Sequence, residues 1–295
     1  PDHLHPLLAF LLLLQQLALP ADISAVALRS DVLAVGVDRT PGDDLATDRS
    51  LDRDLELLSE LKSDPALRPI PVVVVTDSTA ESDILNAYSH GACSFVSKPA
   101  SVEDRRRLFG RFADYWAQVA QLPRAISESE DVYGRSLDDG VTANLDSIAP
   151  VEILIVDDSE DDVVLLQEAF SGCSLVDFIE RVEDGEEAMR FLRREGAFAN
   201  ARRPSLVLLD INMPRKNGFE VLAEMRNDPT LCRIPVVMLT TSKQESDILR
   251  AYENGACSFI SKPVNFDRMR EIAHQFATYW ALVADVPDNR AVVPA

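Results

Sequence analysis

The sequence contains few cysteines and few histidines, and neither residue type is arranged as a metal-binding motif. The cysteines are Cys93, Cys173, Cys232 and Cys257. They form no CxxC pair. His3 and His5 form an HxH near the beginning of the chain, but a zinc site needs three or four ligands. We therefore predict reduced, buried thiols in a cytoplasmic protein and no zinc site.

Positive charge is also scarce. The 29 lysines and arginines are outnumbered by 49 aspartates and glutamates, for a formal net charge of −20. The imbalance is shared, because residues 1–150 carry 13 basic and 24 acidic side chains and residues 151–295 carry 16 and 25. Contacts to nucleic-acid phosphates need Lys and Arg, so this composition argues against a nucleic-acid partner. A net charge far from zero keeps a protein soluble, and we interpret the excess of acidic residues in this way.

No hydrophobic run is long enough for a membrane span. The longest, residues 7–19, reads LLAFLLLLQQLAL, whereas a transmembrane helix needs about 20 apolar residues. No Lys or Arg precedes this run, and Gln15 and Gln16 interrupt it, which differs from a signal peptide. We predict a buried helix here and no contact with a membrane.

An internal repeat organises the chain. Residues 71–100 and 235–264 are identical at 20 of 30 positions, with an offset of 164. Such self-similarity predicts two copies of one fold. Residues 124–150 between them are rich in Ser, Asp and Glu and are predicted to be an acidic linker. The predicted organisation is a degenerate first copy at 1–123, the linker at 124–150, an intact second copy at 151–286 and a tail at 287–295.

The second copy alternates strand patterns with helix patterns. Strands are predicted at 153–156, 175–179, 206–209, 236–239 and 258–261. Helices are predicted at 161–170, 185–194, 219–226, 246–254 and 267–283. This alternation predicts an α/β fold with a doubly wound, five-stranded parallel sheet covered by helices on both faces. Ligands of such sheets bind at the carboxyl ends of the strands.

Polar residues follow the predicted strands at that edge. Asp157 and Asp158 end the first strand, Asp210 the third, Thr240 the fourth and Lys262 the fifth. Clustered carboxylates repel one another unless a cation or a pKa shift relieves them. Oxygen ligands combined with a phosphate oxygen suit Mg²⁺. A carboxylate can also act as a nucleophile and become an aspartyl phosphate, whose oxygens the metal, the ammonium and the hydroxyl would stabilise.

These motifs, Asp-Asp, Asp-Ile-Asn-Met-Pro, Thr-Thr-Ser and Ser-Lys-Pro, resemble those of the response-regulator receiver (CheY-like) family over about 135 residues, the length that such a domain occupies. The resemblance implies that Asp210 is the phospho-acceptor. It implies that Asp158 binds Mg²⁺ directly, and that Asp157 acts beside it, partly through water. The backbone carbonyl of Asn212 would be a third metal contact. Lys262 would pair with the phosphoryl group.

The same resemblance assigns the conformational switch. Thr240 would be the hydroxyl that moves towards the phosphate. Phe259 takes the place of the switch aromatic, three residues before Lys262, and lacks a hydroxyl, so it would act by packing alone. Asn212 and Ser242 hold positions that tune the lifetime of the phosphoryl group.

Each motif taken alone has an ordinary structural explanation. Asp157 and Asp158 could be helix N-cap residues. Thr240 could be a plain strand-end residue, and Lys262 with Pro263 could form a common turn. The site prediction depends on their joint occurrence at successive strand ends.

A longer pattern, SKxESDILxAYxxGAxSFIxKPV followed by a helix containing Tyr-Trp, resembles a narrower group of stand-alone receivers paired with phytochromes. This resemblance implies a sensor histidine kinase of the phytochrome type as a partner. Members often dimerise through the C-terminal face, where Tyr279 and Trp280 lie. The alternative for these two aromatics is packing within the core.

The first copy retains Thr76, Lys98 and Pro99 but has no counterpart of the acidic pair. The offset aligns Asp210 with Ala46, whereas residues 32–37 make a better third strand and would place Asp38 at the acceptor position. Without a Mg²⁺ site phosphoryl transfer should fail, so we predict a degenerate pseudo-receiver kept for packing or partner contact. A missing strand would expose a sheet edge, which the second copy could cover as an intramolecular pseudo-dimer. A homodimer is the alternative.

The sequence therefore predicts a two-component response regulator that catalyses only its own Mg²⁺-dependent phosphorylation and dephosphorylation. It shows no DNA-binding, cyclase or phosphodiesterase segment, so output is expected through protein contact. Three alternatives stay open. They are a phosphate sink or relay that passes the group to a histidine phosphotransfer protein, a phosphorylation-independent scaffold, and a metal-dependent hydrolase. A hydrolase of this kind needs a positioned general base or a pair of metal ions, and the sequence indicates neither.

Overall fold

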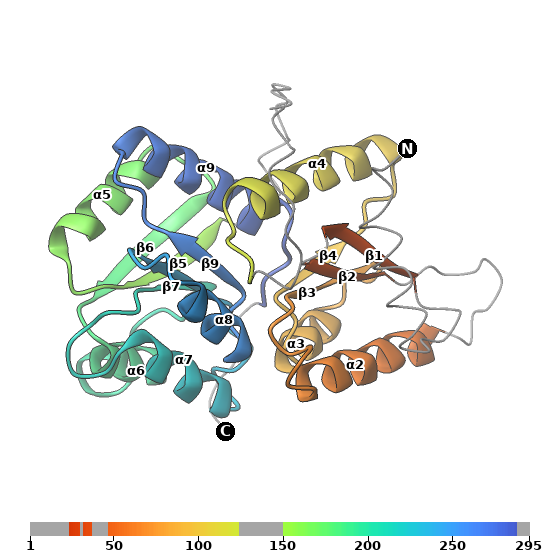
Figure 1. Ribbon diagram of the computed structural model, residues 1–295, viewed down its shortest axis with the longest axis horizontal. Coiled ribbons are helices and arrows are strands. Elements are labelled where there is room, and N and C mark those ends of the chain that lie inside the picture. The colour runs from red at the N-terminus through yellow and green to blue at the C-terminus, as the bar shows by residue number, and fades with distance from the viewer. Residues whose placement is uncertain (1–23, 30–31, 37–46, 124–149, 288–295) are drawn as a thin grey trace.

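The computed structural model describes residues 24–29, 32–36, 47–123 and 150–287. The helix predicted at 7–19, the HxH histidines and all of the predicted linker except Pro150 lie outside these residues. Two sheets, each flanked by helices, lie side by side (Figure 1). No helix in the described ranges is long and apolar enough to span a membrane.

The second copy forms the predicted sheet. Its strands are β5 (Val151–Val156), β6 (Val176–Val182), β7 (Leu206–Leu209), β8 (Val236–Thr240) and β9 (Ser258–Ser261). All pairings are parallel, and the strand order is β6-β5-β7-β8-β9. Nearly every residue of β5, β7, β8 and β9 is buried, as expected for parallel strands that are covered on both faces.

Helices cover both faces of this sheet (Figure 1). One face carries α5 (Glu160–Phe170) and α9 (Phe266–Leu282), and the other carries α6 (Gly185–Arg193), α7 (Gly218–Asn227) and α8 (Glu245–Glu253). The short 3₁₀ helix η2 (Gly196–Phe198) follows α6. Four of these helices begin after a polar N-cap whose side chain accepts a hydrogen bond from the first turn. The doubly wound fold is therefore confirmed.

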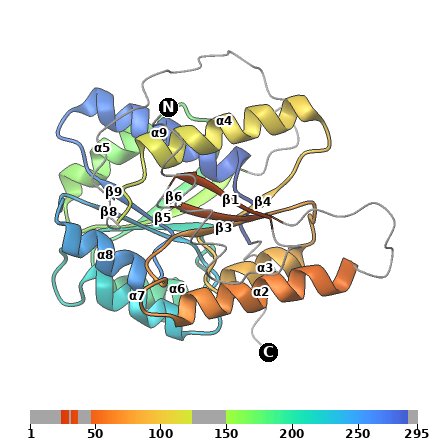
Figure 2. The same cartoon turned by 45° about the vertical axis from the view of Figure 1, so that its right-hand side comes forward.

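The first copy is a smaller version with one altered strand. It contains β1 (Ser24–Arg29), β2 (Val32–Gly36), α2 (Thr47–Ser63), β3 (Val72–Thr76), α3 (Glu81–Ser89), β4 (Ser94–Ser97) and α4 (Val102–Gln118). The strand order is β1-β2-β3-β4, with β1 antiparallel to β2. Figure 2 shows α4 on one side of this sheet and α2 and α3 on the other. Strand β1 therefore lies beside β2, where the second copy has β5 beside β7.

Strand register corrects the predicted acceptor position of the first copy. Leu33 pairs with Val72 in β3, just as Val207 pairs with Val236 in β8. Counting forward along both strands, Gly36 corresponds to Asp210. The strand predicted at 32–37 is present, but Asp38 is two residues too far along the chain and lies outside the described residues.

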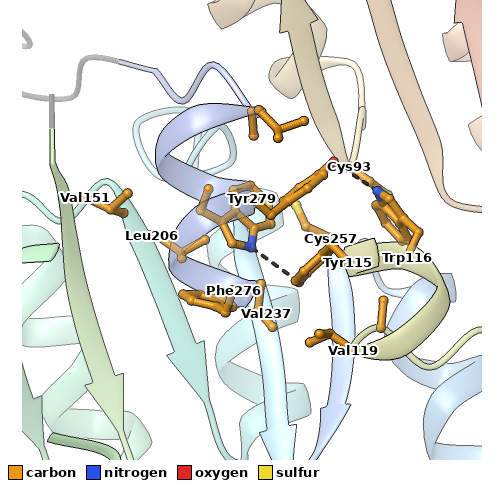
Figure 3. Packing of buried hydrophobic residues seen from close by; sticks show 14 of the residues in the cluster. Cys93, Tyr115, Trp116, Val119, Val151, Leu206, Val237, Cys257, Phe276 and Tyr279 are labelled. Carbon is orange, nitrogen blue, oxygen red and sulfur yellow. Dashed lines mark hydrogen bonds between the residues drawn. The ribbon is translucent and has the colours of Figure 1, made fainter. Parts of the chain in front are cut away.

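The two copies pack together through α4 and α9, which share one hydrophobic core (Figure 3). Tyr115 and Tyr279 stack with ring centroids 4.2 Å apart. The Trp116 indole donates to the Tyr279 hydroxyl at 3.0 Å, and the Trp280 indole donates to the Tyr115 hydroxyl at 3.3 Å. All four side chains are buried. Tyr279 and Trp280 thus contact the other copy and also belong to the core.

Two main-chain hydrogen bonds to β9 and β4 are reciprocal in the same way as the aromatic contacts. Gln121 N donates to Phe259 O at 2.7 Å, and Asp285 N donates to Phe95 O at 2.8 Å. Each pair is related by the offset of 164, so the copies are arranged about an approximate two-fold axis. An intramolecular pseudo-dimer is therefore present, but the predicted reason for it was wrong. It forms beside β4 and β9, whereas β1 covers the edge of β2 that faces away from β3.

The prediction of buried thiols holds for half of the cysteines. All four are free; Cys93 and Cys257 are buried, whereas Cys173 and Cys232 are partly exposed. Burial raises the pKa of Cys257 to about 12, so its thiol stays protonated at neutral pH.

Candidate active site

Lys262 lies at the centre of the carboxyl edge of the second sheet. Its Nζ is 2.7 Å from Asp157 Oδ2, 2.8 Å from Asp162 Oδ2 and 3.3 Å from Asp210 Oδ1. Asp157, Asp210, Thr240 and Lys262 are all buried. The parallel sheet has therefore brought the strand-end residues together, as predicted.

The pocket holds more negative than positive charge. Three carboxylates face one ammonium, so two negative charges remain uncompensated there. Burial raises the pKa of Asp157, although its hydrogen bond and ion pair with Lys262 oppose the shift. Burial alone would lower the pKa of Lys262, but the hydrogen bonds that its ammonium donates to Asp157 and Asp162 outweigh burial and raise that pKa. The lysine therefore stays positively charged, and the three carboxylates around it repel one another.

Local backbone contacts fix the position of Asp210. Its main-chain N donates to Val156 O at 2.9 Å, and its Oδ2 accepts from the backbone N of Asn212 at 2.7 Å. The backbone of Gly218, at the start of α7, approaches so closely that a Cβ there would collide with the Asp210 carbonyl oxygen. Asp210 is therefore held from three sides, with Oδ1 directed at Lys262.

The loop after β8 is connected to the end of β9. Ser242 N donates to Thr240 Oγ1 at 3.3 Å, and the Ser242 hydroxyl donates to Asp247. Ser261 Oγ shares its one proton between Ser242 O at 3.0 Å and Gln121 Oε1 at 2.9 Å. Lys262 N donates to Thr240 O at 2.7 Å. A displacement of Thr240 would consequently change the hydrogen bonds of Ser242 and Ser261.

The remaining predicted residues occupy different environments. Phe259 is fully buried in the core formed by the second copy, consistent with a residue that acts by packing. Asp158 and Asn212 are exposed at the rim of the pocket. The carboxylate of Asp158 is therefore open to solvent, whereas that of Asp157 faces Lys262.

The donor set fits a hard divalent cation that binds with few protein ligands. In the described part of the chain, no three His, Cys, Asp or Glu side chains form a metal cage by themselves. Mg²⁺ usually keeps several waters and takes one or two carboxylates together with phosphate oxygens. The uncompensated charge around Lys262 supplies the electrostatic attraction for such an ion.

Sequence reasoning missed two residues near this pocket. Asp162 lies in the first turn of α5 and pairs with Lys262, but nothing distinguishes it within the acidic run from Asp157 to Asp162. Gln121 belongs to the first copy and accepts from Ser261 Oγ at 2.9 Å. No sequence signal marks it, because the contact joins residues 140 positions apart.

Within its described residues, the first copy keeps the same edge without an acidic pair. Lys98 N donates to Thr76 O at 2.7 Å, and Ser97 Oγ donates to Ser78 O at 2.8 Å, as their counterparts do in the second copy. The strand that would carry the acidic pair is replaced by β1, which is antiparallel, so its carboxyl end points to the opposite edge.

Comparison with known proteins agrees with this geometry. The model of the response regulator receiver domain matches residues 153–274. Response regulator Rcp1 of Synechocystis is 37% identical over 142 residues, which are 48% of this chain and 97% of that protein. The probable methanogenesis regulatory protein FilR2 of Methanothrix harundinacea is 35% identical over 137 residues, which are 46% of this chain and 87% of that protein.

A solved structure is similar over the same share of the chain. The phosphorylated cyanobacterial phytochrome response regulator RcpA is 43% identical and covers 48% of this chain and 100% of its own, with a TM-score of 0.46. Two relatives above 30% identity are thus matched over most of their own length. The chain belongs to the response-regulator receiver family.

Proposed function

We propose that the second copy accepts a phosphoryl group on Asp210 from a sensor histidine kinase and signals by protein contact. The observation that carries this proposal is the position of Lys262, whose ammonium links Asp210 Oδ1 to the buried Asp157. A fixed cation beside a fixed carboxylate is what an incoming phosphoryl group requires, because its charge must be stabilised as the new bond forms.

The transfer uses groups that are already in position. An Asp210 carboxylate oxygen attacks the phosphorus, and the bond from phosphorus to the donor nitrogen breaks. The hydrogen bond from Asn212 N to Asp210 Oδ2 orients the carboxylate. Lys262 pairs with one phosphoryl oxygen, and the Thr240 hydroxyl donates to another after it leaves Ser242 N. The chain then catalyses only its own phosphorylation and dephosphorylation.

Receiver domains of this family bind Mg²⁺ or Mn²⁺. In this pocket Mg²⁺ would be held by Asp158 and Asp210, by Asp157 partly through water, and by the backbone carbonyl of Asn212. When bound, the ion neutralises phosphoryl oxygens as a Lewis acid. Lys262 supplies the other positive charge of the pocket, and its ion pairs hold Asp157 and Asp210 in place.

Exposed apolar side chains beside the pocket support a protein donor. Val164 and Leu165 on α5 are 55% and 44% exposed, and Val264 is fully exposed two residues after Lys262. A helical donor domain could cover these residues while it presents its phosphohistidine to Asp210. The motif SKxESDILxAYxxGAxSFIxKPV narrows the donor to a phytochrome-type kinase.

A second candidate is a scaffold that acts without phosphorylation. It is favoured by one specific observation, the extensive packing between the copies through Tyr115, Trp116, Tyr279 and Trp280. Because buried aromatic side chains hold the copies together, a partner could recognise the pair of copies alone. A relay to a histidine phosphotransfer protein uses the same Asp210 chemistry and differs only in the fate of the phosphoryl group.

The test is incubation of the protein with Mg²⁺ and acetyl phosphate, followed by intact mass measurement. We expect one phosphoryl group per chain, and none in Asp210→Asn. The matched control is Asp177→Asn, which changes an exposed carboxylate on β6 outside the pocket and should label like the wild type. Absence of labelling in the wild type would favour the scaffold, and two groups per chain would show that the first copy is active.

A further inference from the structure

Gln121, a residue of the first copy, makes three hydrogen bonds to the second copy. Its main-chain N donates to Phe259 O at 2.7 Å. Its main-chain O accepts from the Tyr252 hydroxyl at 2.8 Å. Its side-chain Oε1 accepts from Ser261 Oγ at 2.9 Å. One residue of the first copy thus connects α8 with the last strand, β9, of the second.

The side-chain bond ends next to the phosphorylation pocket. Ser261 precedes Lys262, and its hydroxyl also lies 3.0 Å from the carbonyl oxygen of Ser242. Ser242 in turn donates its N–H to Thr240 Oγ1. The contacts form a continuous path from Gln121 through Ser261 and Ser242 to the hydroxyl that must reorient towards a phosphoryl group.

The symmetry-related residue makes a different contact. Asp285 accepts from Ser97 N at 2.8 Å through its carboxylate, and it donates its own N–H to Phe95 O. The copy that it reaches has Gly36 at the acceptor position. The interface is therefore symmetric in its packing but has only one side that touches a phosphorylation pocket.

We propose that Gln121 is a positioning residue of that pocket, which holds Ser261 and the Thr240–Ser242 loop in the unphosphorylated arrangement. Phosphorylation of Asp210 and docking of the first copy are then linked, and the linkage acts in both directions. Gln121 fixes the Ser261 side chain against Ser242 O. A movement of the Thr240–Ser242 loop breaks this shared hydrogen bond, so the Gln121 contact opposes phosphorylation. This inference depends on the proposed function of Asp210.

The chain carries its own probe of the interface. It has two tryptophans, Trp116 and Trp280, and each donates its indole N–H across the boundary between the copies. Intrinsic tryptophan fluorescence therefore reports on the interface between the copies.

The experiment uses the full chain with Mg²⁺ and beryllofluoride, a phosphoryl mimic. Binding is measured by calorimetry and docking by tryptophan fluorescence. We expect the wild type to change its fluorescence on saturation. Gln121→Ala should bind beryllofluoride about 2- to 10-fold more tightly, the size expected when one hydrogen bond is removed from the competing state. Its fluorescence change should be smaller.

Two further variants separate this effect from a general loosening of the interface. Asp285→Ala removes the corresponding side-chain acceptor on the opposite copy and should bind beryllofluoride within about twofold of the wild type, in line with additivity of distant sites. Ser261→Ala removes the donor and should tighten binding as Gln121→Ala does. The double variant Gln121→Ala with Ser261→Ala should add little to either, because both remove one shared interaction.

The outcomes distinguish the inference from the function on which it depends. Unchanged or weaker binding by Gln121→Ala, or equal tightening by Asp285→Ala, overturns the role of Gln121 while Asp210 remains the acceptor. Wild-type binding without any fluorescence change also overturns it. If the wild type takes up neither beryllofluoride nor a phosphoryl group from acetyl phosphate, the proposed function fails, and the inference fails with it.

Discussion

Lys262 illustrates how one side chain can serve both structure and chemistry. Removing an ion-pair partner from buried carboxylates leaves uncompensated charge, which is costly. The lysine therefore stabilises the Asp157–Asp210 pair even when no ligand is bound. The same ammonium would stabilise the negative charge of a phosphoryl group. Its ion pairs fix its position before the reaction begins.

We predict that Lys262→Gln slows phosphorylation by acetyl phosphate by about 100-fold or more, the usual effect of losing one preorganised charge-stabilising donor. Lys98→Gln provides the control, because it alters the corresponding lysine of the first copy and should leave the rate unchanged. The rates are read from the appearance of phosphorylated protein by intact mass. Equal slowing in the two variants would show that the first copy takes part in the reaction.

Among the elements, the strands of the second copy were predictable and the contacts between copies were not. Short apolar runs such as 206–209 alternate with helix patterns, which predicts buried parallel strands. Parallel strands end at the same edge of the sheet, so Asp210 and Lys262 were expected to meet there, as they do. Antiparallel β1 could not be foreseen, because a short apolar run carries no strand direction. From the sequence, Tyr279 and Trp280 fit a core position and an interface position equally well, and the structure shows both.

The loop between β7 and α7 depends on close backbone approach at one glycine. An added Cβ at Gly218 would collide with the carbonyl of Asp210. We expect Gly218→Ala to destabilise the protein by about 1–3 kcal/mol, as overpacking does, and to slow phosphorylation because Asp210 is displaced. Gly110→Ala is the control, since Gly110 lies in α4 with open space around its Cα, and it should stabilise by about 0.5–1 kcal/mol through helix propensity. Urea denaturation of both variants measures these differences.

At the scale of the whole molecule, the duplication has produced a pseudo-dimer within one chain. Equivalent residues meet across the boundary, and the aromatic contacts between α4 and α9 are reciprocal. Fully burying a large apolar side chain contributes about 1.5–3 kcal/mol as an upper estimate, so four buried aromatic side chains bind the copies firmly. The face that could pair two separate chains is thereby occupied.

This symmetry predicts what the second copy does alone. Separated from residues 1–149, it would expose Phe276, Tyr279 and Trp280, which are buried in the full chain. Because the first copy presents equivalent residues, a second identical copy can take its place and turn the approximate two-fold axis into an exact one. We expect residues 150–295 to form a homodimer and the full chain to remain monomeric, because the aromatic face is free only in the fragment. Light scattering distinguishes these states. In the fragment, Tyr279→Ala combined with Trp280→Ala should give a monomer, and a monomeric unmodified fragment would show that the interface needs features found only in the first copy.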